Sequence, residues 1–164
     1  MAVAEISQGT VYVKGRHPLF RAKGFGIPVG DRVLLTPCEA MYLFEKGKIK
    51  VREGGNFLTA DELFHKLSAI SEDFPRRYPV YRDLRERGYV VCETDGKPDF
   101  LVYEPSDYKR AKPPSFSVLC VIQGSPLRIE DLRNSLSKFD EVLLAVSDRR
   151  GSVVYYRASR LFEG

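Results

Sequence analysis

YPVYRDLRERGYVV, residues 78–91, is the stretch from which the fold can be worked out. Tyr81 and Leu84 recur at the spacing of one helical face, and Gly88 is typical of the residue at which a helix ends. The apolar residues that follow, from Tyr89 to Glu93, favour a strand. The stretch therefore predicts a helix that turns directly into a strand.

Downstream of this stretch, the chain alternates strands with turns and one further helix. Residues 94–97 (TDGK) form a turn signal between residues 89–93 and 100–104, which predicts a β-hairpin. A polar loop is expected at 104–114, then a buried strand at 115–122. An amphipathic helix follows around Ile129, Leu132 and Leu136, and strands at 142–146 and 153–157 flank a turn at 148–151. These elements predict a mixed five-stranded sheet with flanking helices.

Upstream, the sequence predicts a small α+β domain. Strands are expected at 11–13 and 32–35, separated by a loop at 24–28, and a further strand at 48–52. Two capping boxes mark helix starts, one from Thr36 to Glu39 and one from Thr59 to Glu62.

The domain boundary is expected near residues 71–75. There the helical pattern breaks, because Pro75 and Pro79 are not expected to lie together inside one continuous helix. We therefore predict an N-terminal α+β domain at 1–72 and a C-terminal mixed-sheet domain at 75–164. The fold class is α/β, of the α+β kind.

The composition is that of a folded protein, with 43% hydrophobic and 29% charged residues. A net charge of +4 and a pI near 9.0 are compatible with nucleic-acid contact, although proteins of many kinds share them. No stretch approaches the roughly 20 apolar residues of a membrane span, and the first residues lack the pattern of a signal peptide. The sequence therefore predicts a cytoplasmic protein without membrane contact. Its few asparagines and glutamines favour a thermophilic source.

Neither a metal nor a cofactor is expected. Cys38, Cys92 and Cys120 are widely spaced within apolar runs, which is typical of buried thiols rather than of a zinc site. Pro98-Asp99 matches the opening of metal-dependent restriction-type nucleases, but no Glu-x-Lys follows to hold Mg²⁺ and position water. We interpret Pro98-Asp99 as the entry to a strand.

Four segments carry a family resemblance: EAMYLFEKGKIKV at 39–51, YPVYRDLRERGYVV at 78–91 followed by DFLVY at 99–103, VLLAVSD at 142–148 and GSVVYY at 151–156. Together and in this order they resemble the archaeal tRNA-splicing (tRNA-intron) endonucleases. The first segment is similar to the N-terminal domain of that family, and the others are similar to its catalytic domain. The resemblance implies an endonuclease-like mixed sheet in the second half of the chain.

The resemblance also implies a chemistry. Members cleave precursor tRNA without metal, leaving a 2′,3′-cyclic phosphate, and they use a Tyr and a His for the acid-base work and a Lys to stabilise charge on the phosphate. Tyr103 matches the tyrosine. The histidine is missing, since prolines occupy positions 113 and 114 and no histidine follows His65. Asp140-Glu141 stands where the lysine is expected, with Lys138 slightly upstream.

This chain is therefore expected to be a non-catalytic, structural subunit, in which Tyr103 is a relict without working partners. We also considered His17 and His65 as substitutes, but a lone histidine in such a context is more often a surface or core residue. The resemblance implies a tetramer of two catalytic and two structural chains, acting on precursor tRNA.

Two segments are candidates for the subunit interface. In the last predicted strand, at 153–157, Val153 and Tyr155 alternate on one face and could pair with a strand of a partner chain. The simpler interpretation is that this strand is an ordinary sheet edge. The turn Asp148-Arg149-Arg150-Gly151 matches a loop that is acidic in the family and inserts into the opposing subunit. The two arginines depart from that pattern and place this contact in doubt.

The alternative function is a stand-alone RNA-binding protein or a weakly active nuclease-like homodimer. This function would be supported if basic side chains formed one face that binds RNA phosphates. The competing explanation is that the same side chains belong to an ordinary solvated surface. The main candidates are Arg76, Arg77, Arg82, Lys109, Arg110 and Lys112, with Arg85 and Arg87 on the same helix.

Overall fold

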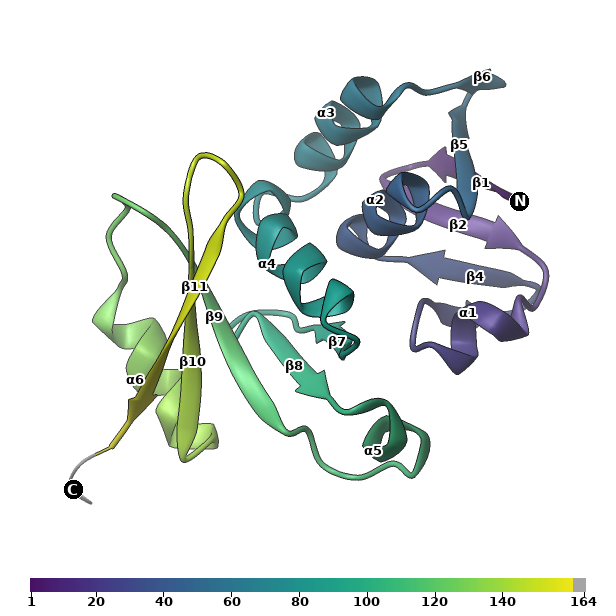
Figure 1. Cartoon of the computed structure of the whole chain (residues 1–164). Helices are drawn as coiled ribbons and strands as arrows, with labels where there is room; N and C mark the ends of the chain where they lie inside the picture. Colours follow the sequence, from purple (N-terminus) through teal and green to yellow (C-terminus); the bar gives the residue numbers. More distant parts are fainter. Residues whose placement is uncertain (161–164) are drawn as a thin grey trace. The chain divides into compact units, whose positions relative to one another are not determined.

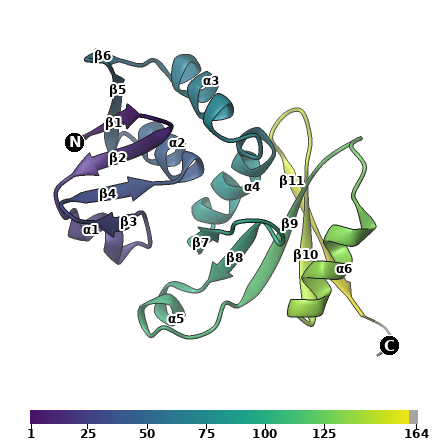
Figure 2. The ribbon, with the colours of Figure 1, turned by 180° about the vertical axis from the view of Figure 1, so that it is seen from behind.

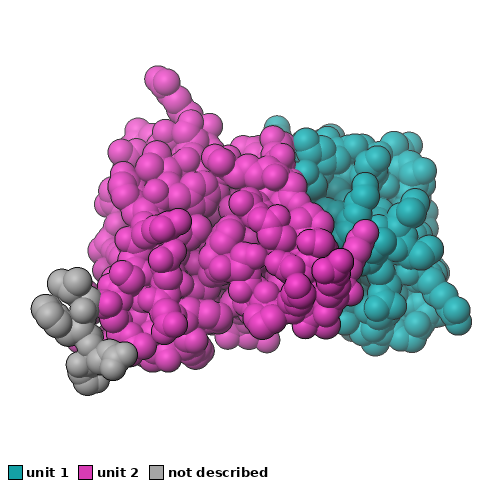
Figure 3. Space-filling view, turned by 60° about the horizontal axis from the view of Figure 1, so that its bottom comes forward, with its two compact units in different colours: residues 1–75 teal, residues 76–164 magenta. Residues whose placement is uncertain are grey.

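The computed structural model, which describes residues 1–160, divides into two units, Met1–Pro75 and Arg76–Gly164 (Figure 3). Each unit contains one mixed sheet with helices, so the α+β fold class is confirmed (Figure 1). None of the described helices is long and apolar enough to cross a membrane.

A six-stranded sheet forms the centre of unit 1, in the order β3-β4-β2-β1-β5-β6. The strands are β1 (Ala2–Ser7), β2 (Thr10–Lys14), β3 (Ile27–Val29), β4 (Arg32–Leu35), β5 (Ile49–Glu53) and β6 (Asn56–Phe57). Only β1 and β5 pair in parallel. Alternate residues of these strands, such as Ala4, Val13 and Val51, are buried on one face of the sheet.

Three helices belong to unit 1: α1 (Pro18–Ala22), α2 (Pro37–Glu45) and α3 (Ala60–Ile70). Both predicted capping boxes are confirmed, at Thr36 with Glu39 and at Thr59 with Glu62. Glu39 has a second role, because its Oε2 accepts a hydrogen bond of 2.6 Å from the amide of Gly26. The α2 cap thus also fixes the chain that leads into β3.

The predicted loop at 24–28 is wrong in its second half, because Ile27 and Pro28 belong to β3. Pro28 is tolerated there since β3 is the outermost strand of its sheet, where the missing N–H leaves no ladder bond unmade. The strands β1 and β6 and the short helix α1 were not predicted at all. Each is short or lacks a clean alternation of apolar and polar residues.

A single helix, α4 (Phe74–Glu86), contains both Pro75 and Pro79, so the expectation that these two prolines would not share one continuous helix is wrong. Pro75 lies in the first turn, where the backbone N–H groups have no intrahelical partner in any case. The missing N–H of Pro79 would have bonded the carbonyl of Pro75, four residues earlier, so only one bond near the helix start is lost.

The second unit contains the predicted mixed five-stranded sheet, which is confirmed, in the order β11-β10-β9-β8-β7. Its strands are β7 (Val90–Glu93), β8 (Phe100–Tyr103), β9 (Phe116–Ile122), β10 (Glu141–Ser147) and β11 (Val153–Ser159). Only β9 and β10 are parallel, joined through α6 (Ile129–Lys138). The loop expected at 104–114 is wrong in part, because α5 (Pro105–Lys109) begins there with a proline at its first position.

The two faces of this sheet are covered by different helices (Figures 1 and 2). On one face α4 packs against the sheet, with the Tyr81 and Phe100 rings 5.9 Å apart. The register of the strands places Val118, Leu143 and Tyr155 on that face with Phe100. Buried Leu119 and Val142 lie on the opposite face, where α6 crosses from β9 to β10.

Candidate functional site

Three positions singled out from the sequence come together at one end of the unit 2 sheet. Tyr103 ends β8, residues 113–114 precede β9, and residues 140–141 stand at the start of β10. Because β8 runs antiparallel to β9 and β10 runs parallel to it, the end of β8 and the starts of β9 and β10 meet at the same edge. The topology thus gathers one tyrosine, two prolines and two acids.

Tyr103 is partly buried and makes an edge-on contact with Tyr108 of α5, at 5.6 Å between ring centroids. Its pKa is raised, first because burial disfavours the phenolate and then through the nearby Cys92 and Tyr108. The phenol therefore stays protonated near neutral pH. Tyr103 pairs across the hairpin with Val90, on the face of the sheet opposite Phe100.

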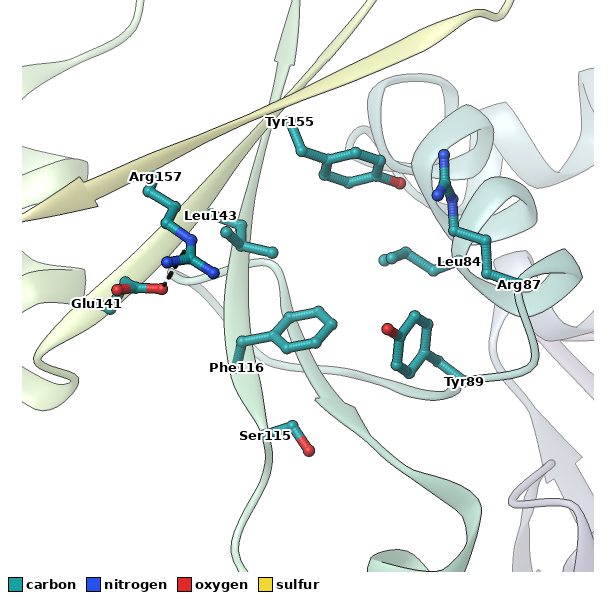
Figure 4. A pocket seen from close by; sticks show the side chains of 9 residues that line it. All are labelled: Leu84, Arg87, Tyr89, Ser115, Phe116, Glu141, Leu143, Tyr155 and Arg157. Atoms are coloured by element: carbon teal, nitrogen blue, oxygen red, sulfur yellow. Dashed lines mark ion pairs between the residues drawn. The ribbon is translucent and has the colours of Figure 1, made fainter.

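A pocket of about 300 Å³ opens on the other face, between α4 and the sheet (Figure 4). It is lined by Leu84, Arg87, Tyr89, Ser115, Phe116, Glu141, Leu143, Tyr155 and Arg157. Glu141, at the position expected to hold a lysine, forms an ion pair of 3.4 Å with Arg157. Tyr103 does not line this pocket, so the pocket and the tyrosine belong to different faces of the sheet.

Asp83 ties the pocket wall together. Its Oδ2 accepts hydrogen bonds from the Tyr155 hydroxyl at 2.6 Å and from Arg87 Nε at 2.8 Å. Burial, and then the bond to Asp83, raises the pKa of Tyr155 well above its usual value. A tyrosine held in this way is neither a proton acceptor nor a ready proton donor, so the contact fastens β11 to α4.

Chemically, this part of unit 2 offers no histidine for acid-base work. A histidine is absent from the whole of residues 66–164, and His17 and His65 belong to unit 1. Within residues 1–160 no group of three or more His, Cys, Asp or Glu side chains is arranged to hold a metal ion. The carboxylate of Glu141 would repel, rather than stabilise, a phosphate at the sheet end.

Two of the RNA-contact candidates, Arg76 and Arg77, bind a buried carboxylate in unit 2. Asp99 is fully buried (0% exposed). Its carboxylate accepts two hydrogen bonds of 2.8 Å from the Arg76 guanidinium and one of 2.9 Å from Arg77 Nε. Arg77 is only 6% exposed and also donates to the carbonyls of Thr94 and Gly96. Arg77 therefore holds the turn between β7 and β8 onto α4.

The Asp99 carboxylate is stabilised in its charged form. Burial by itself would raise its pKa, but the hydrogen bonds and charge of Arg76, the Cys120 amide at 2.8 Å and Lys97 together lower the pKa to about 2. Sequence reasoning treated Asp99 only as the entry to a strand. The two adjacent arginines, flanked in α4 by apolar and aromatic residues at 74–75 and 78–81, were the signal that could have pointed to a buried acid.

The other basic candidates are distributed over separate elements. Arg82 of α4 lies over the Tyr78 ring, whereas Lys109, Arg110 and Lys112 are exposed in and after α5. Arg85, by contrast, is buried against Tyr81. The structure therefore does not gather the predicted cations into one surface.

The two interface candidates on β11, Val153 and Tyr155, lie on the same side of the strand. Val153 and Tyr155 face α4, whereas Val154 and Tyr156 on the other side are 54% and 57% exposed. In the turn before β11, Asp148 Oδ1 accepts hydrogen bonds from the backbone amides of Arg150 and Ser152, so this carboxylate stabilises the turn itself. Arg149 and Arg150 are exposed at the tip.

Comparison with known proteins places both units. Residues 2–64 match the family model of the tRNA intron endonuclease N-terminal domain, and residues 74–155 match that of the catalytic C-terminal domain. A tRNA-splicing endonuclease of Methanococcoides burtonii is 31% identical over 163 residues, which cover 96% of this chain and 46% of that protein. One from Pyrococcus horikoshii is 32% identical over 149 residues, covering 88% of this chain and 85% of that protein. The chain thus spans less than half the length of the first relative and most of the second.

Proposed function

This chain belongs to the tRNA intron endonuclease family, and we propose that it serves there as a structural subunit that assembles with a catalytic chain on precursor tRNA. One observation carries the proposal. At the sheet end where the resemblance implies Tyr, His and Lys, this chain has Tyr103 alone, with prolines at 113–114 and Asp140-Glu141. Without the histidine and the lysine, the tyrosine lacks the partners that the reaction needs.

The assembly we propose has two catalytic and two structural chains, and it works in the cytoplasm without a metal or another cofactor. The closing strand supports a role in pairing, because β11 is the last strand of its sheet and runs for seven residues. Its face away from α4 is apolar and exposed at Val154 and Tyr156. We therefore move the proposed contact from Val153 and Tyr155 to these two residues, and keep the turn at 148–151 as a second contact.

The test is cleavage of a precursor tRNA that carries a bulge-helix-bulge. The purified chain alone is expected to leave the precursor intact, and cleavage is expected when a histidine-bearing homologue is added. Gel filtration with light scattering should then find a complex of four chains. A stand-alone nuclease-like homodimer, the alternative function, would cleave by itself. Cleavage by this chain that survives replacement of both His17 and His65 would refute the structural role.

Replacing Tyr103 by phenylalanine is expected to leave the rate of the assembled enzyme within a few fold of the wild type. Loss of a working acid or base typically lowers a rate by about 10² to 10⁴. Single-turnover cleavage by the assembled enzyme measures the difference. A drop of that size, with the complex intact by gel filtration, would show that Tyr103 of this chain takes part in the reaction.

A further inference from the structure

One face of the sheet in unit 1 carries no buried side chain within the described residues. We call it the open face, and it consists of the outward residues of β1 to β6: Val3, Glu5, Ser7, Thr10, Tyr12, Lys14, Ile27, Val29, Arg32, Leu34, Lys50, Arg52 and Phe57. The opposite residues of the same strands form the core under α2 (Figure 1), and Figure 2 shows the strands from the open side. The alternation of each strand thus leaves six strands uncovered on one side.

The strand register arranges the open face in two rows. One row crosses all six strands through Ile27, Leu34, Tyr12, Glu5, Arg52 and Phe57. The next row contains Val29, Arg32 and Lys14, with Val3 and Lys50 at the same level on β1 and β5. Two aromatic rings, Tyr12 and Phe57, therefore stand about 14 Å apart in one line, because three strand spacings separate them.

Cations surround both rings. The Arg32 guanidinium lies 4.2 Å from the centre of the Tyr12 ring, and Lys50 and Arg52 lie 5.6 and 5.9 Å from that of Phe57. Four basic side chains stand on the open face against one carboxylate, Glu5, and that carboxylate is paired with Arg52. Within residues 1–160, Lys14, Arg32 and Lys50 have no ion-pair partner. The face is therefore positive where its rings are exposed.

We propose that the open face of unit 1 binds an unpaired segment of RNA, with bases stacked on Phe57 and on the Tyr12–Arg32 pair and phosphates against Lys14, Lys50 and Arg52. Exposed rings on a sheet take unstacked bases, because every base has a flat π-face, and neighbouring cations follow the backbone. A base-paired duplex does not offer its base faces to a flat sheet. The excess of cations likewise fits a polyanion. This site lies in unit 1 and stands independently of the structural role proposed above for unit 2.

The experiment measures binding of the full chain to a labelled 12-nucleotide RNA without self-complementarity, by fluorescence anisotropy at several salt concentrations. Phe57→Ala is expected to weaken binding about 5- to 150-fold, and Phe57→Trp is expected to restore it. Reversing two of the proposed phosphate contacts, Lys14→Glu with Lys50→Glu, should lower the slope of log K against log salt by about 1.4, since each single-strand phosphate contact contributes about 0.7.

A matched control reverses two cations of the helical side of unit 1, Lys46→Glu with Lys66→Glu, and gives the same change in net charge. Binding equal to wild type in this control supports a local site, whereas equal loss in both double variants refutes it. Equal affinity for a duplex of the same length also refutes the proposal. So does an unchanged RNA affinity in Phe57→Ala together with lost binding to the catalytic chain, which would identify a protein interface. Circular dichroism melting curves verify that every variant is folded.

Discussion

Replacing Asp99 by asparagine is expected to lower the free energy of unfolding of unit 2 by about 3 to 5 kcal/mol, the range seen when a buried ion pair loses one partner. Asp99 is fully buried, and its carboxylate accepts hydrogen bonds from the side chains of Arg76, Arg77 and Lys97 and from the amide of Cys120. An amide keeps the volume but removes the charge, so Arg76 and Arg77 would lose the ion pair that each makes with this carboxylate. Denaturant unfolding followed by circular dichroism measures the loss. The matched control is Asp95→Asn, an exposed acid in the same hairpin.

The pH dependence of stability gives a second measure of the same group. The pKa of Asp99 is lowered to about 2 in the folded chain, below its unfolded value of about 3.9, so the unfolded chain binds the extra proton first. Its contribution is present above pH 4 and is lost as the pH falls from about 4 to 2. The Asp99→Asn variant should lack this part of the acid transition. Identical acid transitions in variant and wild type would show that Asp99 is not the stabilising group.

The second large effect concerns assembly. The double change Val154→Asp with Tyr156→Asp is expected to abolish co-purification with a catalytic chain. Both side chains are more than half exposed, so the unit should still fold, whereas two carboxylates at a buried seam would cost several kcal/mol. Each 1.4 kcal/mol weakens association tenfold. Pull-down and gel filtration measure the loss.

Ile129→Asp provides the comparison, because Ile129 is 69% exposed and belongs to α6 rather than to β11. It should bind the catalytic chain as the wild type does. If the β11 double variant binds at wild-type strength while its melting curve is unchanged, the interface lies elsewhere, and the turn at 148–151 becomes the next surface to change.

Local signals predicted much of the fold. The two capping boxes involve residues three apart, and the hairpin turn at 94–97 lies between its own strands, so neither needed knowledge of distant neighbours. Pro79 misled the prediction because the cost of a proline depends on which carbonyl it faces. Pro79 lies four residues after Pro75, whose carbonyl belongs to the first turn of α4.

The sequence was enough to predict which residue types are missing from the candidate site. It was not enough to predict which way the side chains of the site point. The prolines at 113–114 and Glu141 can be recognised in the sequence as departures from the histidine and lysine that the family resemblance implies. Alternation alone did not say which side of 153–157 faces inward, since that depends on where α4 lies, and Tyr155 proved to bond Asp83. Asp99 was missed for a similar reason. Its partners stand more than 20 residues earlier or later, at Arg76, Arg77 and Cys120.

Pro28 has a consequence for how chains can meet. Pro28 stands opposite Val33 in the β3–β4 pairing and has no N–H with which to donate a hydrogen bond. The pairing on either side of it is made by Ile27 with Leu34 and by Val29 with Arg32. The nitrogen of Pro28 therefore points outward from the free side of β3, where an incoming strand would need a donor. The seven residues of β11 contain no proline. The free edge of β3 thus disfavours an added strand, which makes growth into open-ended fibrils through unit 1 unfavourable.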